Sequence, residues 1–104
     1  MLDHFEHALT TLSEECAEVI IECAKIKRFG TDSFDPADPQ RIDNLTRLYK
    51  ELHDVMGAIE NLNNLPGSVF SFVPDTITAL NKMDKIHKYR KVSERLGRVE
   101  KEHE

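Results

Sequence analysis

Apolar residues recur at alternating intervals of three and four along the chain, and this periodicity limits the fold to helices that pack through one face. In the first such stretch the periodic positions are Phe5, Leu9, Leu12, Cys16, Val19, Cys23 and Ile26. Asp3 is followed three residues later by Glu6, which is typical of a helix start, and Gly30 is typical of a helix stop. The spacing therefore predicts a helix over 3–29.

Two further stretches show a related periodicity. In the second stretch the apolar positions are Leu45, Leu48, Leu52, Val55, Ile59 and Leu62. Asp38 and Pro39 offer an N-cap followed by proline at the first helical position, so we expect this helix over 39–63, after a turn-rich loop over 30–38. Pro74 and Asp75 open a third expected helix, which continues toward residue 100. Its apolar positions are Leu80, Met83, Ile86, Tyr89, Val92, Leu96 and Val99.

The expected fold class is all-α, with long antiparallel helices in a four-helix-bundle-type architecture. The 104 residues fit a single domain over 1–104. Three helices present apolar stripes on more sides than one antiparallel pair can cover. We therefore expect the bundle to be completed inside the chain or by oligomerisation, as a homodimer or a homotetramer.

The composition narrows the classes of function. The formal net charge is −5, which argues against general binding to nucleic acid. No stretch approaches the roughly 18 to 20 apolar residues of a membrane span, and the acidic N-terminus is unlike a signal peptide. We expect a cytoplasmic protein with no nucleic-acid partner and no membrane partner. Cys16 and Cys23 are too far apart on one helix to form a disulfide, and we expect both thiols to be buried.

Acidic residues gather on one flank of the first two apolar stripes. Glu15, Glu18 and Glu22 follow one another at helical spacing, and Glu51 and Asp54 do the same in the second stretch. In an antiparallel pair both sets fall on the same side, and Glu18 and Glu51 each lie roughly 17 Å from the loop. Such a cluster of carboxylates favours a hard cation, Mg²⁺ or else Mn²⁺. The alternative interpretation is a pair of solvated helix faces.

The sequences E-E-x-x-E over 14–18 and E-x-x-D over 51–54 resemble the motifs of the MazG-like, all-α nucleoside triphosphate pyrophosphohydrolases. The resemblance covers roughly residues 5–92. It implies hydrolysis of a nucleoside triphosphate to the monophosphate and pyrophosphate, with Mg²⁺ held by Glu15, Glu18, Glu51 and Asp54. It also implies a dimer or tetramer built from four-helix units. The family's asparagine- and arginine-containing motif is matched only loosely, by 88–91, so the base and the sugar stay open.

The predicted chemistry is the attack of water at the α-phosphorus of the nucleotide. A carboxylate that the metal does not fully use can accept the proton of this water, and Glu18 and Glu22 are both candidates. Basic residues precede the apolar positions of the third helix, and among them Lys85 and Lys88 are the expected phosphate contacts. The alternative function is a non-enzymatic helical oligomerisation or interaction module whose acids are surface groups.

Overall fold

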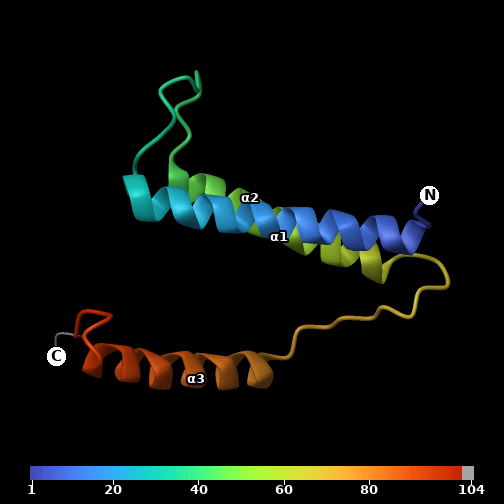
Figure 1. The fold of residues 1–104 in the computed structure, drawn as a ribbon. Coiled ribbons are helices and arrows are strands. Elements are labelled where there is room, and N and C mark those ends of the chain that lie inside the picture. Colours follow the sequence, from blue (N-terminus) through green and yellow to red (C-terminus); the bar gives the residue numbers. More distant parts are fainter. Residues whose placement is uncertain (102–104) are drawn as a thin grey trace. The chain divides into compact units, whose positions relative to one another are not determined.

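The chain forms three α-helices and no strand over residues 1–101, the part that the computed structural model describes. The helices are α1 (His4–Phe29), α2 (Asn44–Asn63) and α3 (Thr76–Arg95) (Figure 1). The all-α prediction is therefore confirmed. None of these helices is both long enough and apolar enough to cross a bilayer.

The ends of α1 follow the signals in the sequence. The side chain of Asp3 accepts a hydrogen bond from the Glu6 backbone N–H at 2.7 Å, which satisfies one of the free donors of the first turn. Gly30 ends the helix with a φ of 93°, a conformation that glycine adopts readily and other residues rarely. The predicted helix over 3–29 is confirmed in both its start and its end.

The start of α2 differs from the prediction. The helix begins at Asn44, with Asp43 as its N-cap, and not at Pro39. Asp38 has a different role, because its carboxylate accepts the backbone N–H groups of Gln40 and Ile42 at 2.9 and 3.0 Å. These bonds hold the chain in a tight turn, in which Arg41 has a positive φ of 53°, and the helix can start only after it.

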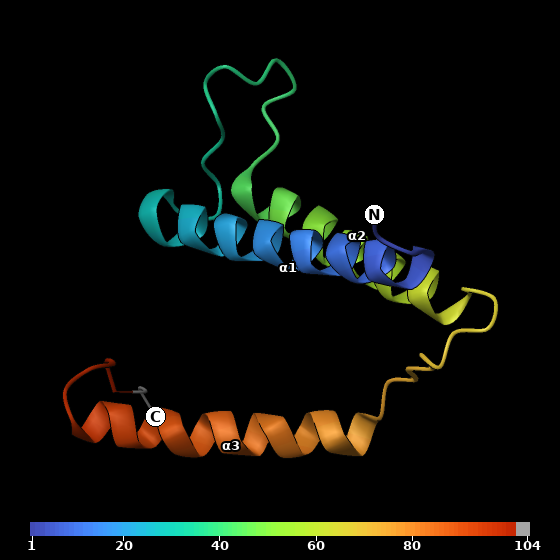
Figure 2. The same cartoon turned by 45° about the vertical axis from the view of Figure 1, so that its right-hand side comes forward.

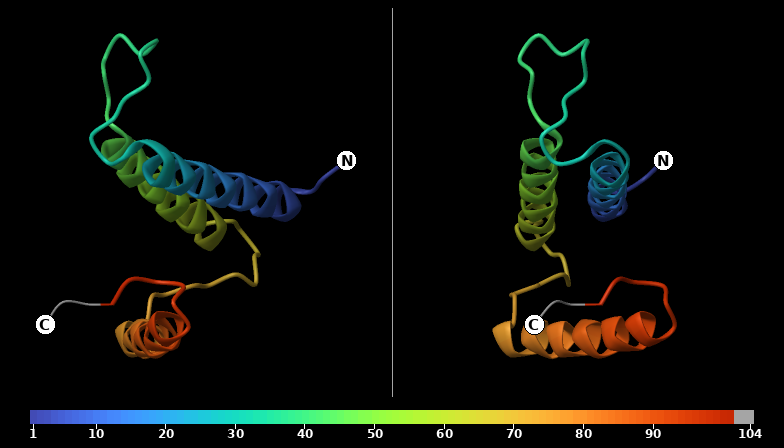
Figure 3. Two further views of the ribbon diagram at one scale, coloured as in Figure 1. Left: turned by 60° about the vertical axis from the view of Figure 1, so that its left-hand side comes forward. Right: turned by 90° about the vertical axis from the view of Figure 1, so that its left-hand side faces the viewer.

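The loop between α1 and α2 is anchored where it meets the two helices. The Asn44 side chain donates to the Gly30 carbonyl at 3.0 Å, and the Asn44 backbone N–H donates to the Ser33 carbonyl at 2.9 Å. Phe34 forms an isolated antiparallel bridge with Asp43. Beyond these anchors the loop stands clear of the helix pair (Figures 2 and 3). It therefore extends the hairpin and leaves the flanks of the helices uncovered.

Helices α1 and α2 lie side by side and antiparallel (Figure 1), but they meet through only about half of the positions of each predicted stripe. The buried apolar residues are Ala8, Ala58 and Leu62, and Glu22 is buried with them. The seam of α1 runs through Phe5, Ala8, Leu12, Glu15, Val19, Glu22 and Ile26. The seam of α2 runs through Asn44, Leu48, Glu51, Val55, Ala58 and Leu62. At every second position both seams use the residue immediately before the predicted one.

The cysteines show the consequence of this offset. Cys16 and Cys23 belong to the predicted stripe of α1, yet both are exposed, so the prediction of buried thiols is wrong. The physical reason is that the small side chains of Ala8 and Ala58 let the two backbones approach closely on that side. The other flank of each apolar stripe then stays outside the helix pair.

The chain divides into two compact units, Met1–Phe72 and a second unit that begins at Val73. Helix α3 belongs to the second unit, and its first turn is capped by Asp75, whose side chain accepts from the Ile77 N–H at 3.0 Å. The helix ends at Arg95, so the predicted continuation toward residue 100 is wrong. Gly97, two residues further on, has a φ of 73°, which does not continue a helix. Its large apolar side chains, including Leu80 and Met83, are exposed.

Candidate metal centre

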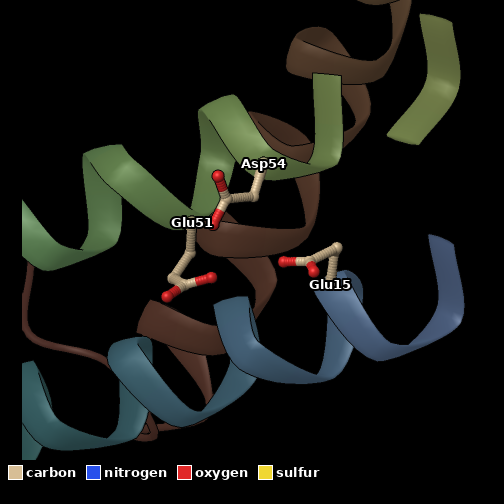
Figure 4. Close-up of side chains that lie close together, drawn as sticks. All are labelled: Glu15, Glu51 and Asp54. Carbon is tan, nitrogen blue, oxygen red and sulfur yellow. The ribbon is translucent and has the colours of Figure 1, made fainter. Parts of the chain in front are cut away.

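Three carboxylates converge between α1 and α2. Oxygen atoms of Glu15, Glu51 and Asp54 lie within 4.8 Å of one another. Glu15 comes from α1, the other two come from α2, and the three groups point toward one another (Figure 4). The sequence predicted that these three acids converge together with Glu18 beside the apolar seam. The structure brings the three together without Glu18, and Glu15 and Glu51 lie in the seam itself.

The offset of the seam explains why these acids meet. Glu15 and Glu51 occupy seam positions, so their stems lie between the helices instead of pointing into solvent. The Glu51 side chain is only 15% exposed, whereas that of Asp54, at the edge of the seam, is 39% exposed.

The electrostatics of the cluster are those of crowded like charges. Burial raises the pKa of Glu51, and the nearby carboxylates of Asp54, Glu15 and Glu18 raise it further. The Lys50 ammonium opposes this shift in the pKa of Glu51. A second cation at the cluster would favour the charged form of Glu51 in the same way.

Lys50 is the cation that the fold itself supplies. Its Nζ atom lies 2.9 Å from Asp54 Oδ2 and 3.7 Å from Glu51 Oε1, and these two acids raise the pKa of the lysine. The Lys50 side chain is nevertheless 68% exposed, so it can swing away at little cost. Sequence reasoning missed Lys50, although its position four residues before Asp54 is the spacing of a helical ion pair.

The donor set fits a hard divalent cation. All three groups are carboxylates, no cysteine or histidine belongs to the cluster, and their oxygens are close enough to share one ion. Mg²⁺ and Mn²⁺ prefer such ligands, whereas zinc prefers sites that include nitrogen or sulfur. The crowding that raises the pKa of Glu51 would be relieved by such an ion.

The other predicted site residues lie around this cluster or away from it. Glu18 is exposed on α1 and acts on Glu51 through its charge, outside the group of three. Glu22 is buried, its Oε1 atom lies 3.1 Å from Lys25 Nζ, and its Oε2 atom has no hydrogen-bond partner among the described residues. Lys85 and Lys88 are exposed on α3, in the other compact unit.

Comparisons of the chain with protein-family models, curated proteins and solved structures give no match. The resemblance to MazG-like hydrolases therefore rests on the two acidic motifs of the sequence.

Proposed function

We propose that this protein is a Mg²⁺-dependent nucleoside triphosphate pyrophosphohydrolase. It would hydrolyse an NTP or a dNTP to the monophosphate and pyrophosphate, with water attacking the α-phosphorus. The observation that carries the proposal is the convergence of Glu15, Glu51 and Asp54 from two facing helices. These are three of the four acids that match the metal-binding motifs of the MazG-like family.

In the proposed mechanism Glu15, Glu51 and Asp54 would hold the metal, and Glu18, one turn further along α1, would complete the set. The bound ion would neutralise the triphosphate charge and orient the attacking water. With an ion bound, Lys50 would leave Asp54, and its ammonium group would be free to contact a phosphate oxygen.

The general base is the residue that accepts the proton of the attacking water, and Glu18 suits this role better than Glu22. Glu18 is exposed and lies beside the cluster. Glu22 is buried and paired with Lys25. A base must reach the water directly, so the pairing and burial of Glu22 favour a structural role for it.

The proposed substrate-binding residues are Lys85 and Lys88, which would contact the phosphates or the leaving pyrophosphate. The proposed assembly is a homodimer or a homotetramer, because a four-helix unit needs more helices than α1 and α2 provide. No further protein partner, nucleic acid or membrane is needed for this function.

The decisive experiment incubates the protein with each NTP and dNTP in Mg²⁺ and measures pyrophosphate and the monophosphate. We expect turnover of at least one nucleotide, and a loss of about 100-fold or more for Asp54→Asn, because a metal ligand is removed. Glu60→Gln is the matched control, since Glu60 is an exposed acid of α2 outside the cluster. No turnover across the whole panel, or full activity of Asp54→Asn, would contradict the proposal.

The second candidate is a non-enzymatic helical interaction module, and the Lys50 ion pairs favour it. Lys50 already neutralises part of the acidic cluster, as a surface ion pair does. In that case Mg²⁺ should not change the melting temperature of the protein, and no nucleotide should be hydrolysed. Thermal melts with and without Mg²⁺ therefore separate the two candidates before any substrate is known.

A further inference from the structure

A cavity of about 430 Å³ lies where α1 meets the loop that leads to α2. We call it the loop cavity. The acidic cluster shares no residue with it. The residues that line it are Lys25 and Phe29 of α1, Asn44 at the start of α2, and Ser33, Phe34 and Asp35 of the loop.

Two phenylalanine rings supply the apolar part of the loop cavity. Phe29 is 59% exposed and Phe34 is 40% exposed, although phenylalanine is usually buried. A guanidinium group lies 5.8 Å from the centre of each ring, that of Arg28 over Phe29 and that of Arg41 over Phe34. The exposed fractions show that the rings are still accessible beside these contacts. A planar ligand suits such a pair of rings, because its apolar face stacks on an aromatic side chain.

The polar groups at the loop cavity suit the edge of a planar ligand. Asp35 Oδ1 accepts a hydrogen bond from the Ala37 backbone N–H at 2.9 Å, and its second carboxylate oxygen offers a further acceptor. The Ser33 hydroxyl and the Asn44 amide can each donate and accept. A ligand with apolar faces and a polar edge matches this lining, and nucleobases have this character.

The loop cavity lies on the same flank of the hairpin as the acids. Asn44 precedes Glu51 by seven residues on α2, and Lys25 follows Glu18 by seven residues on α1. Seven residues make almost two helical turns, so the members of each pair lie on one side of their helix, about 10 Å apart along its axis. This separation is comparable with the distance between the phosphate and the base of one nucleotide.

Side-chain ion pairs hold the walls of the loop cavity in place. Arg47, seven residues before Asp54, ties the loop to α2, with its Nη2 atom 2.6 Å from Asp38 Oδ2. The Nζ atom of Lys25 lies 3.1 Å from Oε1 of the buried Glu22. The cavity is therefore formed before any ligand binds, which lowers the entropic cost of binding.

We propose that the loop cavity binds the base of the nucleotide whose phosphates are held at the acidic cluster. The base would stack on Phe29 and Phe34, and Asp35 would accept a hydrogen bond from an amino group of the base. Cytosine, adenine and guanine carry such a group, whereas uracil and thymine do not, so the cavity favours the first three. This inference rests on the proposed function, because it needs the phosphates at the acidic cluster.

Calorimetry in Mg²⁺ with two probes tests the binding of the base. One probe is a dCTP analogue with a non-hydrolysable bridge between the α- and β-phosphorus, and the other is inorganic triphosphate, which has no base. Phe34→Ala should weaken the binding of the analogue about tenfold, because one stacking contact is lost, and should leave the binding of triphosphate unchanged. Phe34→Tyr keeps a ring and should bind the analogue as wild type does. Tyr49→Ala is the matched control, since Tyr49 is an exposed aromatic side chain outside the cavity.

The two probes also separate this inference from the proposed function. If wild type binds triphosphate as tightly as the analogue, or if Phe34→Ala weakens both probes equally, the inference is overturned while the proposed function stands. The same holds if Phe34→Ala hydrolyses nucleotides with an unchanged KM. If wild type binds neither probe, the inference and the proposed function both fail.

A second pair of probes tests the role of Asp35. The dCTP analogue and the corresponding dUTP analogue differ in one group of the base, which is an amino group in cytosine and a carbonyl oxygen in uracil. Wild type should bind the cytosine analogue about tenfold more tightly, because a carboxylate accepts from the amino group and repels the carbonyl oxygen. Asp35→Asn should bring the ratio close to one, since an amide can also donate and keeps the acceptor for the Ala37 N–H. A wild-type preference for the uracil analogue, or an unchanged ratio in Asp35→Asn, would overturn the assignment of Asp35.

Discussion

Folding and metal binding favour different protonation states of Glu51. Its side chain is mostly buried between two helices, next to Glu15 and Asp54, and both burial and these neighbours raise its pKa. The folded chain therefore disfavours the charged form of Glu51, whereas a cation needs that form. A site of this kind lowers stability when it is free of metal and recovers the loss when metal binds.

The first prediction at this scale concerns Glu51→Gln in metal-free buffer. The variant should melt at a higher temperature than wild type at pH 7, because it lacks the disfavoured charge. When folding raises the pKa of a carboxyl group, the free energy of unfolding falls as the pH rises from the ordinary pKa of the group, 4.5 for Glu51, through its pKa in the folded protein. The advantage of the variant should accordingly shrink toward zero below about pH 4.5.

Mg²⁺ completes the test. At a concentration ten times its dissociation constant, a metal that binds only the folded protein adds about 1.4 kcal/mol of stability. Wild type should gain this stabilisation and Glu51→Gln should not, so their melting temperatures should approach each other or cross. Equal shifts for both proteins would show that the metal binds elsewhere.

At the residue scale the sequence predicted much of the cluster but not its counter-ion. The E-x-x-E and E-x-x-D spacings predicted that Glu15, Glu18, Glu51 and Asp54 converge, and the structure brings all of these except Glu18 together. Lys50 was not predicted, because the pattern that indicates the cluster consists of acids alone, and those of α1 have no lysine among them. The local spacing from Lys50 to Asp54 was a signal that could have found it.

At the element scale, periodicity predicted which segments are helical but not which edge of each stripe is buried. An apolar stripe with spacings of three and four is wider than one helix–helix contact, so either edge can face the neighbour. Ala8 and Ala58 decide the matter in favour of one edge, since small residues permit close approach, and Cys16 is left outside. The start of α2 was misplaced because Asp38 closes a turn with its own carboxylate instead of capping the helix.

Gly57 and Gly67 give a prediction about α2 and the turn that follows it. Gly57 lies inside α2, and a Cβ added there would have no neighbour within 4 Å. Gly57→Ala should therefore raise the stability by about 0.5–1 kcal/mol, because alanine favours the helix and loses less entropy on folding.

Gly67 is the matched control for that substitution. A Cβ added at Gly67 would also meet open space, but the φ of this residue is 72°, which alanine adopts only with strain. Gly67→Ala should lower the stability by about 1 kcal/mol. Urea unfolding followed by circular dichroism measures both variants, and the same sign for the two would contradict the assignment of the end of α2.

At the scale of the whole molecule, the hairpin buries very little. Ala8, Ala58 and Leu62 are the buried apolar residues of the described chain, and two of the three are alanines. Chains of about 100 residues normally bury roughly two-thirds of the surface that they expose when unfolded. Large apolar side chains of α1, α2 and α3 are exposed in addition, and burying them would stabilise the fold.

The last prediction follows from this reserve and concerns the concentration dependence of thermal stability. If a second copy supplies the missing contacts, unfolding is coupled to dissociation, and each tenfold rise in protein concentration adds about 1.4 kcal/mol per dimer. For a domain of this size that corresponds to an increase of a few degrees in Tm. Melts recorded by circular dichroism between 1 and 100 µM, roughly a hundredfold range, should show the rise for wild type and none for Ile20→Asp, because the variant carries a charge on the exposed apolar surface of α1. A wild-type Tm that is independent of concentration over this range would mean that the chain covers its own apolar surface.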